Sequence, residues 1–228
     1  MLLAGLRVAT KRSNTRTALI SLALLFLQGI SKLPAQDKVS MPVVAAAHLV
    51  PGGPAVYLGS GLLLTAAHVV NPGTDISAVI ARTQLPAQVL KQGLYEDIDL
   101  SLLRVDESKL PPPLPTVQLC STPPWPGDPV IVIDSAQATR STIAAPSALP
   151  ALYQHRFPTL IRDVVTTGNS GSGVFDATKK CLLGIMSRKF TVNGRDIAKY
   201  FVSADLIRVF MKGIELPKEN PDDAEKAH

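Results

Sequence analysis

Cysteine and metal-binding motifs are scarce in this sequence, and their scarcity excludes several classes of protein. The 228 residues contain only 2 Cys, too few for a small scaffold held by several disulfides or for a zinc site with four cysteine ligands. The 4 His residues form no His-Glu-x-x-His motif, so the sequence predicts no metal site and no cofactor. A hydrophobic fraction of 46% argues against intrinsic disorder.

Acidic residues are absent from the first 35 positions, and the net charge of +5 arises entirely in this segment. Five of the 23 basic residues lie in that segment, and this leaves 18 basic against 18 acidic residues in the rest of the chain. A neutral body has no basic surface of the kind that binds nucleic acid. We therefore predict no nucleic-acid partner.

The N-terminal segment, residues 1–35, has the features of a signal peptide. Basic residues at positions 7–16 precede an uncharged, mostly apolar stretch of 14 residues at 17–30. This stretch is shorter than the roughly 20 apolar residues of a spanning helix, and cleavage fits after Ala35, although Leu33 is bulky for its position. We predict an exported protein, periplasmic or secreted. A retained signal anchor, which would be the only membrane contact, and a buried N-terminal helix are the alternatives.

Short apolar runs separated by Pro, Gly and Asn begin at residue 43 and predict an all-β sandwich or barrel. Apolar residues at helical spacing predict one helix from Ala204 to Gly213, with Ser203 as N-cap. Strands are expected at 43–50, 55–58, 62–65, 76–82, 88–91, 98–105, 129–133, 173–175, 182–187, 190–192 and 198–202.

Six prolines lie between Leu110 and Trp125, and they exclude a helix interior or a central strand there. We expect residues 111–126 to link two lobes, 36–110 and 127–216. Residues 217–228 are expected to be a polar tail with no appended folded domain.

Three segments carry the groups that acyl transfer needs, in the order His, Asp, Ser. His68 lies in the segment LTAAHVV, Asp99 in DIDLSLL and Ser170 in TTGNSGSG. An α/β-hydrolase requires the order Ser, acid, His, and the only histidine after Ser170 is His228. The order therefore argues against that fold.

The three segments resemble those of chymotrypsin-fold, trypsin-like serine peptidases, in particular bacterial heat-shock peptidases and glutamyl endopeptidases. The resemblance covers about residues 43–212. It implies two six-stranded antiparallel β-barrels with a C-terminal helix, without a PDZ domain. It also implies a serine endopeptidase of the EC 3.4.21 class that needs no cofactor and acts on protein or peptide substrates.

Carried over residue by residue, the resemblance makes Ser170 the nucleophile, His68 its general base and Asp99 the group that orients His68. The backbone N–H groups of Gly168 and Ser170 would form the oxyanion hole, with Gly168 in an unusual backbone conformation. Alternation along a strand would put Asp97 on the same face as Asp99. The motif Asp-apolar-small-Leu-Leu favours Asp99.

The substrate pocket is predicted from the same resemblance. No acid occupies the position of Val164, which argues against a preference for Arg or Lys before the cleaved bond. Arg188 and Lys189 suggest an acidic substrate, and two solvated cations at a strand end are the alternative. The predicted pocket residues are Val164, Thr166, Thr167, Ser187 and Arg188.

Each of these predictions has an ordinary alternative. His68 can be a packed imidazole and Ser170 a turn serine, and the chain would then be a catalytically weak or inactive binding or scaffold module. In an exported protein, Cys120 and Cys181 favour a disulfide. His48 and His155 have no partner motif and are interpreted as structural. The sequence predicts no oligomeric state.

Overall fold

The computed structural model describes Pro42 and residues 44–162 and 168–214, and these residues form mainly β-strands. The helices among them are α1 (Ala151–Gln154) and α2 (Ala204–Phe210). The strands are β1 (Ala46–Val50), β2 (Pro54–Gly59), β3 (Leu62–Thr65), β4 (Ile76–Ile80), β5 (Thr83–Gln92), β6 (Ser101–Arg104), β7 (Pro129–Ile133), β8 (Ala138–Ala144), β9 (Leu160–Ile161), β10 (Gly173–Asp176), β11 (Leu182–Val192) and β12 (Arg195–Ser203).

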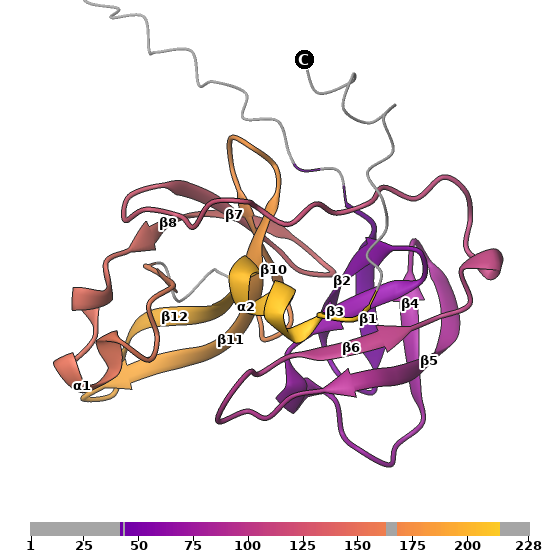
Figure 1. The fold of residues 1–228 in the computed structure, drawn as a ribbon, viewed down its shortest axis with the longest axis horizontal. Helices are drawn as coiled ribbons and strands as arrows, with labels where there is room; N and C mark the ends of the chain where they lie inside the picture. The colour runs from indigo at the N-terminus through magenta and orange to yellow at the C-terminus, as the bar shows by residue number, and fades with distance from the viewer. Residues whose placement is uncertain (1–41, 43, 163–167, 215–228) are drawn as a thin grey trace, which may run out of the picture. The chain divides into compact units, whose positions relative to one another are not determined.

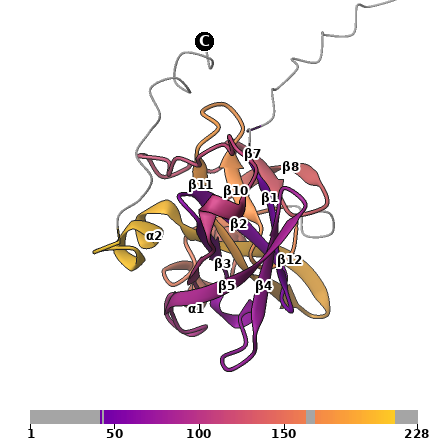
Figure 2. The same cartoon turned by 90° about the vertical axis from the view of Figure 1, so that its right-hand side faces the viewer.

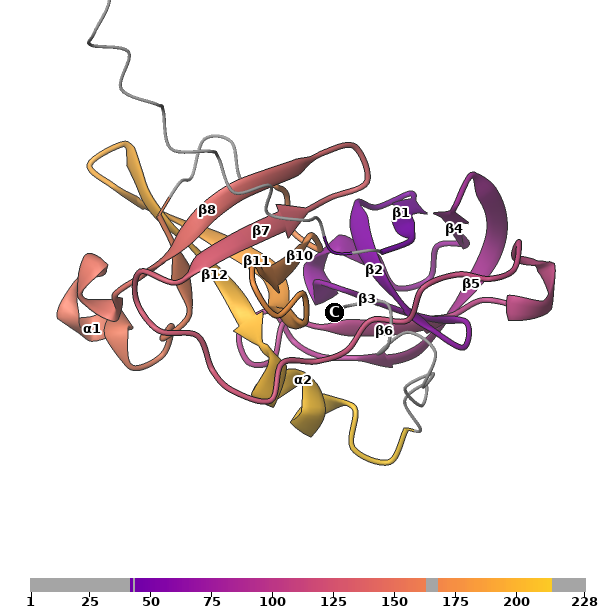
Figure 3. The same ribbon diagram turned by 90° about the horizontal axis from the view of Figure 1, so that it is seen from above.

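The strands close into two antiparallel barrels, which are indigo to magenta and rose to orange in Figure 1. The order of strands is β1-β2-β3-β6-β5-β4 in the first barrel and β10-β11-β12-β9-β8-β7 in the second. α2 follows β12 directly and lies outside the strands in Figures 2 and 3. The predicted fold class, two six-stranded barrels with a C-terminal helix, is confirmed.

Alternating burial shows how the apolar residues form the first barrel. In β4, Ile76, Ala78 and Ile80 are buried while the residues between them are partly exposed. Side chains of a strand alternate between its two faces, so one face of β4 lines the barrel interior. Each large apolar side chain buried there contributes about 1.5–3 kcal/mol.

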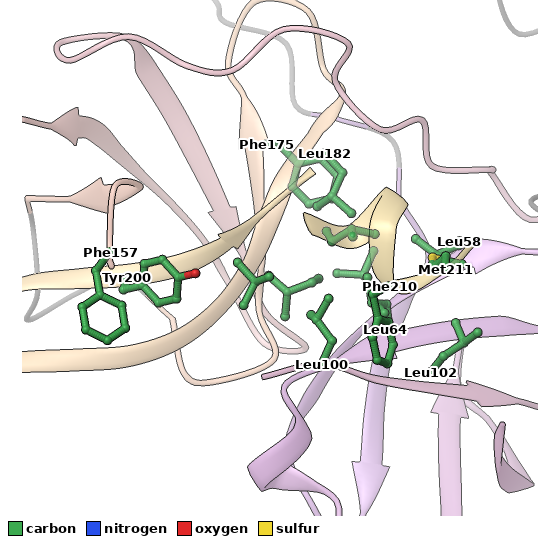
Figure 4. Packing of buried hydrophobic residues seen from close by; sticks show 14 of the residues in the cluster. Leu58, Leu64, Leu100, Leu102, Phe157, Phe175, Leu182, Tyr200, Phe210 and Met211 are labelled. Atoms are coloured by element: carbon green, nitrogen blue, oxygen red, sulfur yellow. The ribbon is translucent and has the colours of Figure 1, made fainter. Parts of the chain in front are cut away.

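A separate apolar cluster joins the two barrels to α2. It includes Leu64 and Leu100 from the first barrel's side, Leu182 from the second and Phe210 from α2, all 5% exposed or less. Figure 4 shows Leu64 and Leu100 beside Phe210. This cluster holds the segments that carry His68 and Asp99 against β11.

The predicted helix is shorter than expected, although its N-cap lies where the sequence placed it. The Ser203 hydroxyl accepts a hydrogen bond from the backbone N–H of Leu206, and the α-helix ends at Phe210. Gly213, the predicted stop, has φ +87°, in the left-handed region that favours glycine. None of the helices in the described part of the chain is long and apolar enough to cross a membrane.

Several predicted strand boundaries are wrong. The expected strands 182–187 and 190–192 are one strand, β11, whose pairing with β12 shifts register between Met186 and Arg188 and again after Phe190. β8 was not predicted because its sequence ATRSTIA is mostly polar and half exposed, and β9 because it has only two residues. The expected strand 98–105 begins only at Ser101, so Asp99 lies in the preceding loop.

Candidate active site

His68 lies in a short 3₁₀ turn, Ala67–Val69, that follows β3. The side-chain amide of Gln92 on β5 donates to the carbonyl oxygens of Ala67 and Val70 at 3.2 and 3.0 Å, which fixes the turn from both ends. The His68 side chain is 33% exposed. Its imidazole is therefore held by the first barrel and remains open to solvent and ligands.

Asp99 is buried beneath His68 and contacts it three times. Asp99 Oδ2 lies 2.8 Å and Oδ1 3.1 Å from His68 Nδ1, and the backbone N–H of His68 donates to Oδ1 at 3.1 Å. The Ser187 hydroxyl donates to Oδ2 at 2.5 Å, and Asp99 is 1% exposed. Asp97, by contrast, is exposed.

The charge of Asp99 is maintained despite its burial. Burial raises the pKa of the Asp99 carboxyl group. The hydrogen bonds from the His68 ring, the Ser187 hydroxyl and the His68 backbone lower this pKa by more than burial raises it, so the pKa of Asp99 lies below its ordinary value. A carboxylate at Nδ1 favours the tautomer with the proton on that nitrogen. Nε2 of His68 is then free to accept a proton.

Ser170 lies in a tight turn in which the next residue, Gly171, has no room for a side chain. Gly171 has φ +93°, and a Cβ there would overlap the carbonyl oxygen of Pro54 and the hydroxyl of Thr65. The Ser170 hydroxyl donates to the backbone carbonyl of Ser187 at 2.8 Å. Because a hydroxyl has one proton, Ser170 in this rotamer does not donate to His68.

The backbone conformation of Gly168 depends on Thr167, which lies outside the described residues, so the expected unusual conformation stays a prediction. Its glycine is explained by close packing. A Cβ would lie 2.6 Å from the Ser172 hydroxyl oxygen and 3.0 Å from a methyl carbon of Val132. Within the described residues, the N–H groups of Gly168 and Ser170 donate no hydrogen bond.

Of the predicted pocket residues, only Ser187 and Arg188 lie within the described part of the chain, and the pocket stays a prediction. Val164, Thr166 and Thr167 lie outside the described residues. The hydroxyl of Ser187 donates to Asp99.

Arg188 and Lys189 are not simply solvated. The Arg188 guanidinium stacks 3.9 Å from the ring centroid of Tyr95 and donates to the Tyr95 carbonyl, and Lys189 is paired with Asp196 at 2.9 Å. Both cations are thus already engaged.

The sequence missed three residues that support the site: Gln92, Tyr95 and Lys199. The Tyr95 ring meets the His68 imidazole edge-on, with centroids 5.1 Å apart and planes at 79°. Lys199 on β12 donates to the Gly168 carbonyl at 2.7 Å. These residues lie in polar or alternating stretches, and no local motif marks them.

The remaining residues singled out by the sequence lie elsewhere. His48 on β1 is hydrogen-bonded to Ser135 at 3.2 Å, and His155 is exposed at the end of α1. Cys120 and Cys181 form a disulfide with their Cα atoms 5.0 Å apart. In the part of the chain that the structure describes, His, Cys, Asp and Glu form no group of three that could hold a metal ion.

The double barrel, together with a buried Asp–His pair that Ser187 connects by hydrogen bonds to the Ser170 turn, defines a chymotrypsin-fold protein of the serine peptidase type. The family described as the trypsin-like peptidase domain matches residues 53–185, which is more than half of the chain. The chain belongs to this family of trypsin-like peptidase domains.

Solved structures resemble the chain in fold. The inactive form of the Rv3671c protease has a TM-score of 0.56 and 20% identity, covering 76% of this chain and 89% of that one. The active form of Rv3671c from M. tuberculosis has a TM-score of 0.55 and 14% identity, covering 95% and 97%. At these identities the similarity shows the fold alone. Comparison with curated proteins finds no match.

Proposed function

We propose that this chain is a serine endopeptidase that hydrolyses protein or peptide substrates through His68, Asp99 and Ser170. The observation that carries the proposal is the hydrogen bond between the buried Asp99 carboxylate and His68 Nδ1, in a member of the trypsin-like peptidase family. A lone histidine on a surface turn needs no such partner. A general base does need one, to set its tautomer and to stabilise the imidazolium it becomes.

The reaction begins when Ser170 turns from the Ser187 carbonyl toward His68. This is a rotation of one side chain between staggered rotamers. His68 Nε2 then takes the hydroxyl proton as Oγ attacks the carbonyl carbon of the substrate, and the imidazolium returns the proton to the leaving amine. The product of this half-reaction is an acyl-enzyme on Ser170, which water attacks in the same way.

The N–H groups of Gly168 and Ser170 donate hydrogen bonds to the negative oxygen of the tetrahedral intermediate. They are uncommitted among the described residues, which leaves them available to a ligand. A missing donor of this kind costs about 2.7–4 kcal/mol of transition-state stabilisation.

Hydrolysis of casein and of a mixed peptide library by the full chain tests the proposal. We expect turnover by the parent protein and its loss in S170A. The matched control is S135A, which removes the hydroxyl of a serine that is hydrogen-bonded to a different histidine, His48. Turnover that survives in S170A, or that is lost equally in S135A, would contradict the assignment.

A binding or scaffold module is the second candidate, and the rotamer of Ser170 favours it. Its hydroxyl donates to Ser187 rather than to His68, an arrangement that cannot attack a substrate until it changes. This candidate predicts that peptides bind to the chain without being cleaved under any condition.

We also propose that the protein is exported. The basic, acid-free N-terminal segment and the disulfide between Cys120 and Cys181 both support an oxidising compartment outside the cytoplasm. N-terminal sequencing of protein recovered from cell fractions tests this proposal. We expect a mature chain beginning at Gln36, whereas an intact Met1 in the cytoplasmic fraction would contradict export.

A further inference from the structure

Lys199 is the residue near the candidate site whose position the proposed mechanism does not explain. It lies on β12 between Ala198 and Tyr200, both buried, and pairs across the sheet with Ile161 of β9. The residue is only partly exposed, although an ammonium group is normally fully solvated. Its Nζ donates to the carbonyl oxygen of Gly168 at 2.7 Å.

The side on which Lys199 lies is set by alternation along β12. Phe201, two residues further on, is fully buried in the core of the second barrel together with Ile161 and Val132. Residues i and i+2 of a strand share a face, so Lys199 lies on this face as well. Gly168 packs against the same core, because a Cβ on it would come within 3.0 Å of Val132.

The turn that carries Ser170 is fixed at three successive points. The carbonyl of Asn169 accepts from the N–H of Ser172 at 3.0 Å, and the N–H of Gly171 donates to the carbonyl of Met186 at 2.8 Å. These two anchors are backbone hydrogen bonds. The third, at the carbonyl of Gly168, comes from the side chain of Lys199.

The anchored peptide group lies between the two proposed oxyanion donors. The carbonyl of Gly168 belongs to the peptide that joins Gly168 to Asn169, whereas the donors are the N–H groups of Gly168 and Ser170. Because this peptide connects the two peptides that carry the donors, a change in the ψ angle of Gly168 that displaces it would reorient one N–H relative to the other. Oxyanion stabilisation depends on donors aimed in advance.

We propose that Lys199 is a positioning residue for the oxyanion hole: by holding the Gly168 carbonyl toward the second barrel, it keeps the N–H groups of Gly168 and Ser170 aimed at one point. The inference rests on the proposed peptidase function. Lys199 acts through Gly168 and contacts no reacting atom, so its loss affects the transition state more than the binding of substrate.

The test compares K199M, K199Q and K199R with the parent protein on one peptide substrate. K199M removes the donor, K199Q keeps a neutral donor and K199R keeps a charged one. A charge-assisted hydrogen bond of this kind corresponds to about a ten- to one-hundred-fold change in rate. We expect kcat of K199M to fall by that factor with KM nearly unchanged, a smaller fall in K199Q, and recovery in K199R.

The matched control is K91M. Lys91 also donates from Nζ to a backbone carbonyl, that of Phe210, at 2.5 Å and far along the chain from the serine turn. K91M therefore loses the same kind of bond, and we expect its kcat to equal that of the parent. Thermal unfolding of all variants shows whether they fold, and if K199M does not, K199Q and K199R carry the comparison.

A peptide aldehyde separates positioning from a general structural effect, because its adduct with Ser170 places a negative oxygen in the oxyanion hole. We expect K199M to weaken aldehyde binding by the same factor as kcat and to leave the binding of an uncleaved product peptide unchanged. A K199M protein with parental kcat overturns the inference. So does a loss confined to KM on peptides with Glu or Asp before the cleaved bond, which would make Lys199 a substrate ligand. If the parent protein itself neither turns over nor binds the aldehyde, the proposed function fails and the inference fails with it.

Discussion

Substitution S187A probes how the buried charge of Asp99 is maintained. The Ser187 hydroxyl donates to Oδ2 of Asp99 at 2.5 Å, and both residues are 1% exposed. A hydrogen bond to a charged group contributes about 1.5–3 kcal/mol, so S187A should lower the free energy of unfolding at pH 7 by that amount. It should also lower kcat/KM about tenfold or more, because Asp99 is held less firmly beneath His68.

The loss of stability in S187A should depend on pH through the pKa of Asp99. The pKa of folded Asp99 lies below the ordinary value of 3.8, so its hydrogen bonds stabilise the fold above that value, and this stabilisation is lost as the pH falls through the folded pKa. S187A raises the folded pKa of Asp99 toward the ordinary value. The difference in unfolding free energy between the parent and S187A should therefore be largest at pH 7 and should decrease as the pH falls below 3.8.

The control for S187A is S101A. Ser101 is also fully buried, but its hydroxyl has no hydrogen-bond partner among the residues that the structure describes. Deleting this hydroxyl breaks no hydrogen bond and removes a buried polar group that lacks a partner, so S101A should not lower the unfolding free energy. Urea unfolding of both variants across the pH range is the assay. Equal effects of S187A and S101A, or an S187A deficit that does not change with pH, would refute the reasoning.

Three further predictions concern the acid, the turn and the disulfide. D99N should lower kcat by a factor of about 10⁴, as loss of the acid does in a Ser-His-Asp triad, while D97N retains the parental kcat. The reverse result would assign the role of the triad acid to Asp97. G171A should unfold at a lower urea concentration than G73A. Both glycines have positive φ, but of the two only Gly171 has atoms within 4 Å of an added Cβ. Equal unfolding midpoints would show that the neighbouring atoms move to admit the Cβ, which contradicts the prediction. Reducing the disulfide, whose cysteines are 61 residues apart, should cost about 4 kcal/mol of stability, and thermal unfolding unaffected by reductant would contradict this.

The fold class and the His68–Asp99 contact follow from motifs that are local in sequence. His68 and Asp99 are each marked by a short block of residues, and their order along the chain distinguishes this fold from an α/β-hydrolase. The apolar alternation of β4 was visible because one face of the strand is buried. Such signals are carried by neighbouring residues, so no structure is needed to read them.

The supporting residues depend on contacts between distant segments and could not be read from the sequence. Lys199 lies 31 residues from the carbonyl that it holds, and Arg188 lies 93 residues from the Tyr95 carbonyl. The contacts of Arg188 with Tyr95 and of Ser187 with Asp99 likewise leave no local pattern, and the assignment of both residues to a substrate pocket stays a prediction. The polar strand β8 was missed because it lacks an apolar face.

Labelling by a fluorophosphonate tests the central claim, a nucleophilic Ser170 activated by His68, most directly. The reagent reacts with an activated serine and with no ordinary turn serine, and mass spectrometry of the labelled peptides identifies the site. We predict one label per chain, on Ser170, that is absent in H68A and unchanged in S135A. Absence of label from the parent protein, or equal labelling of Ser170 in H68A, would contradict the account.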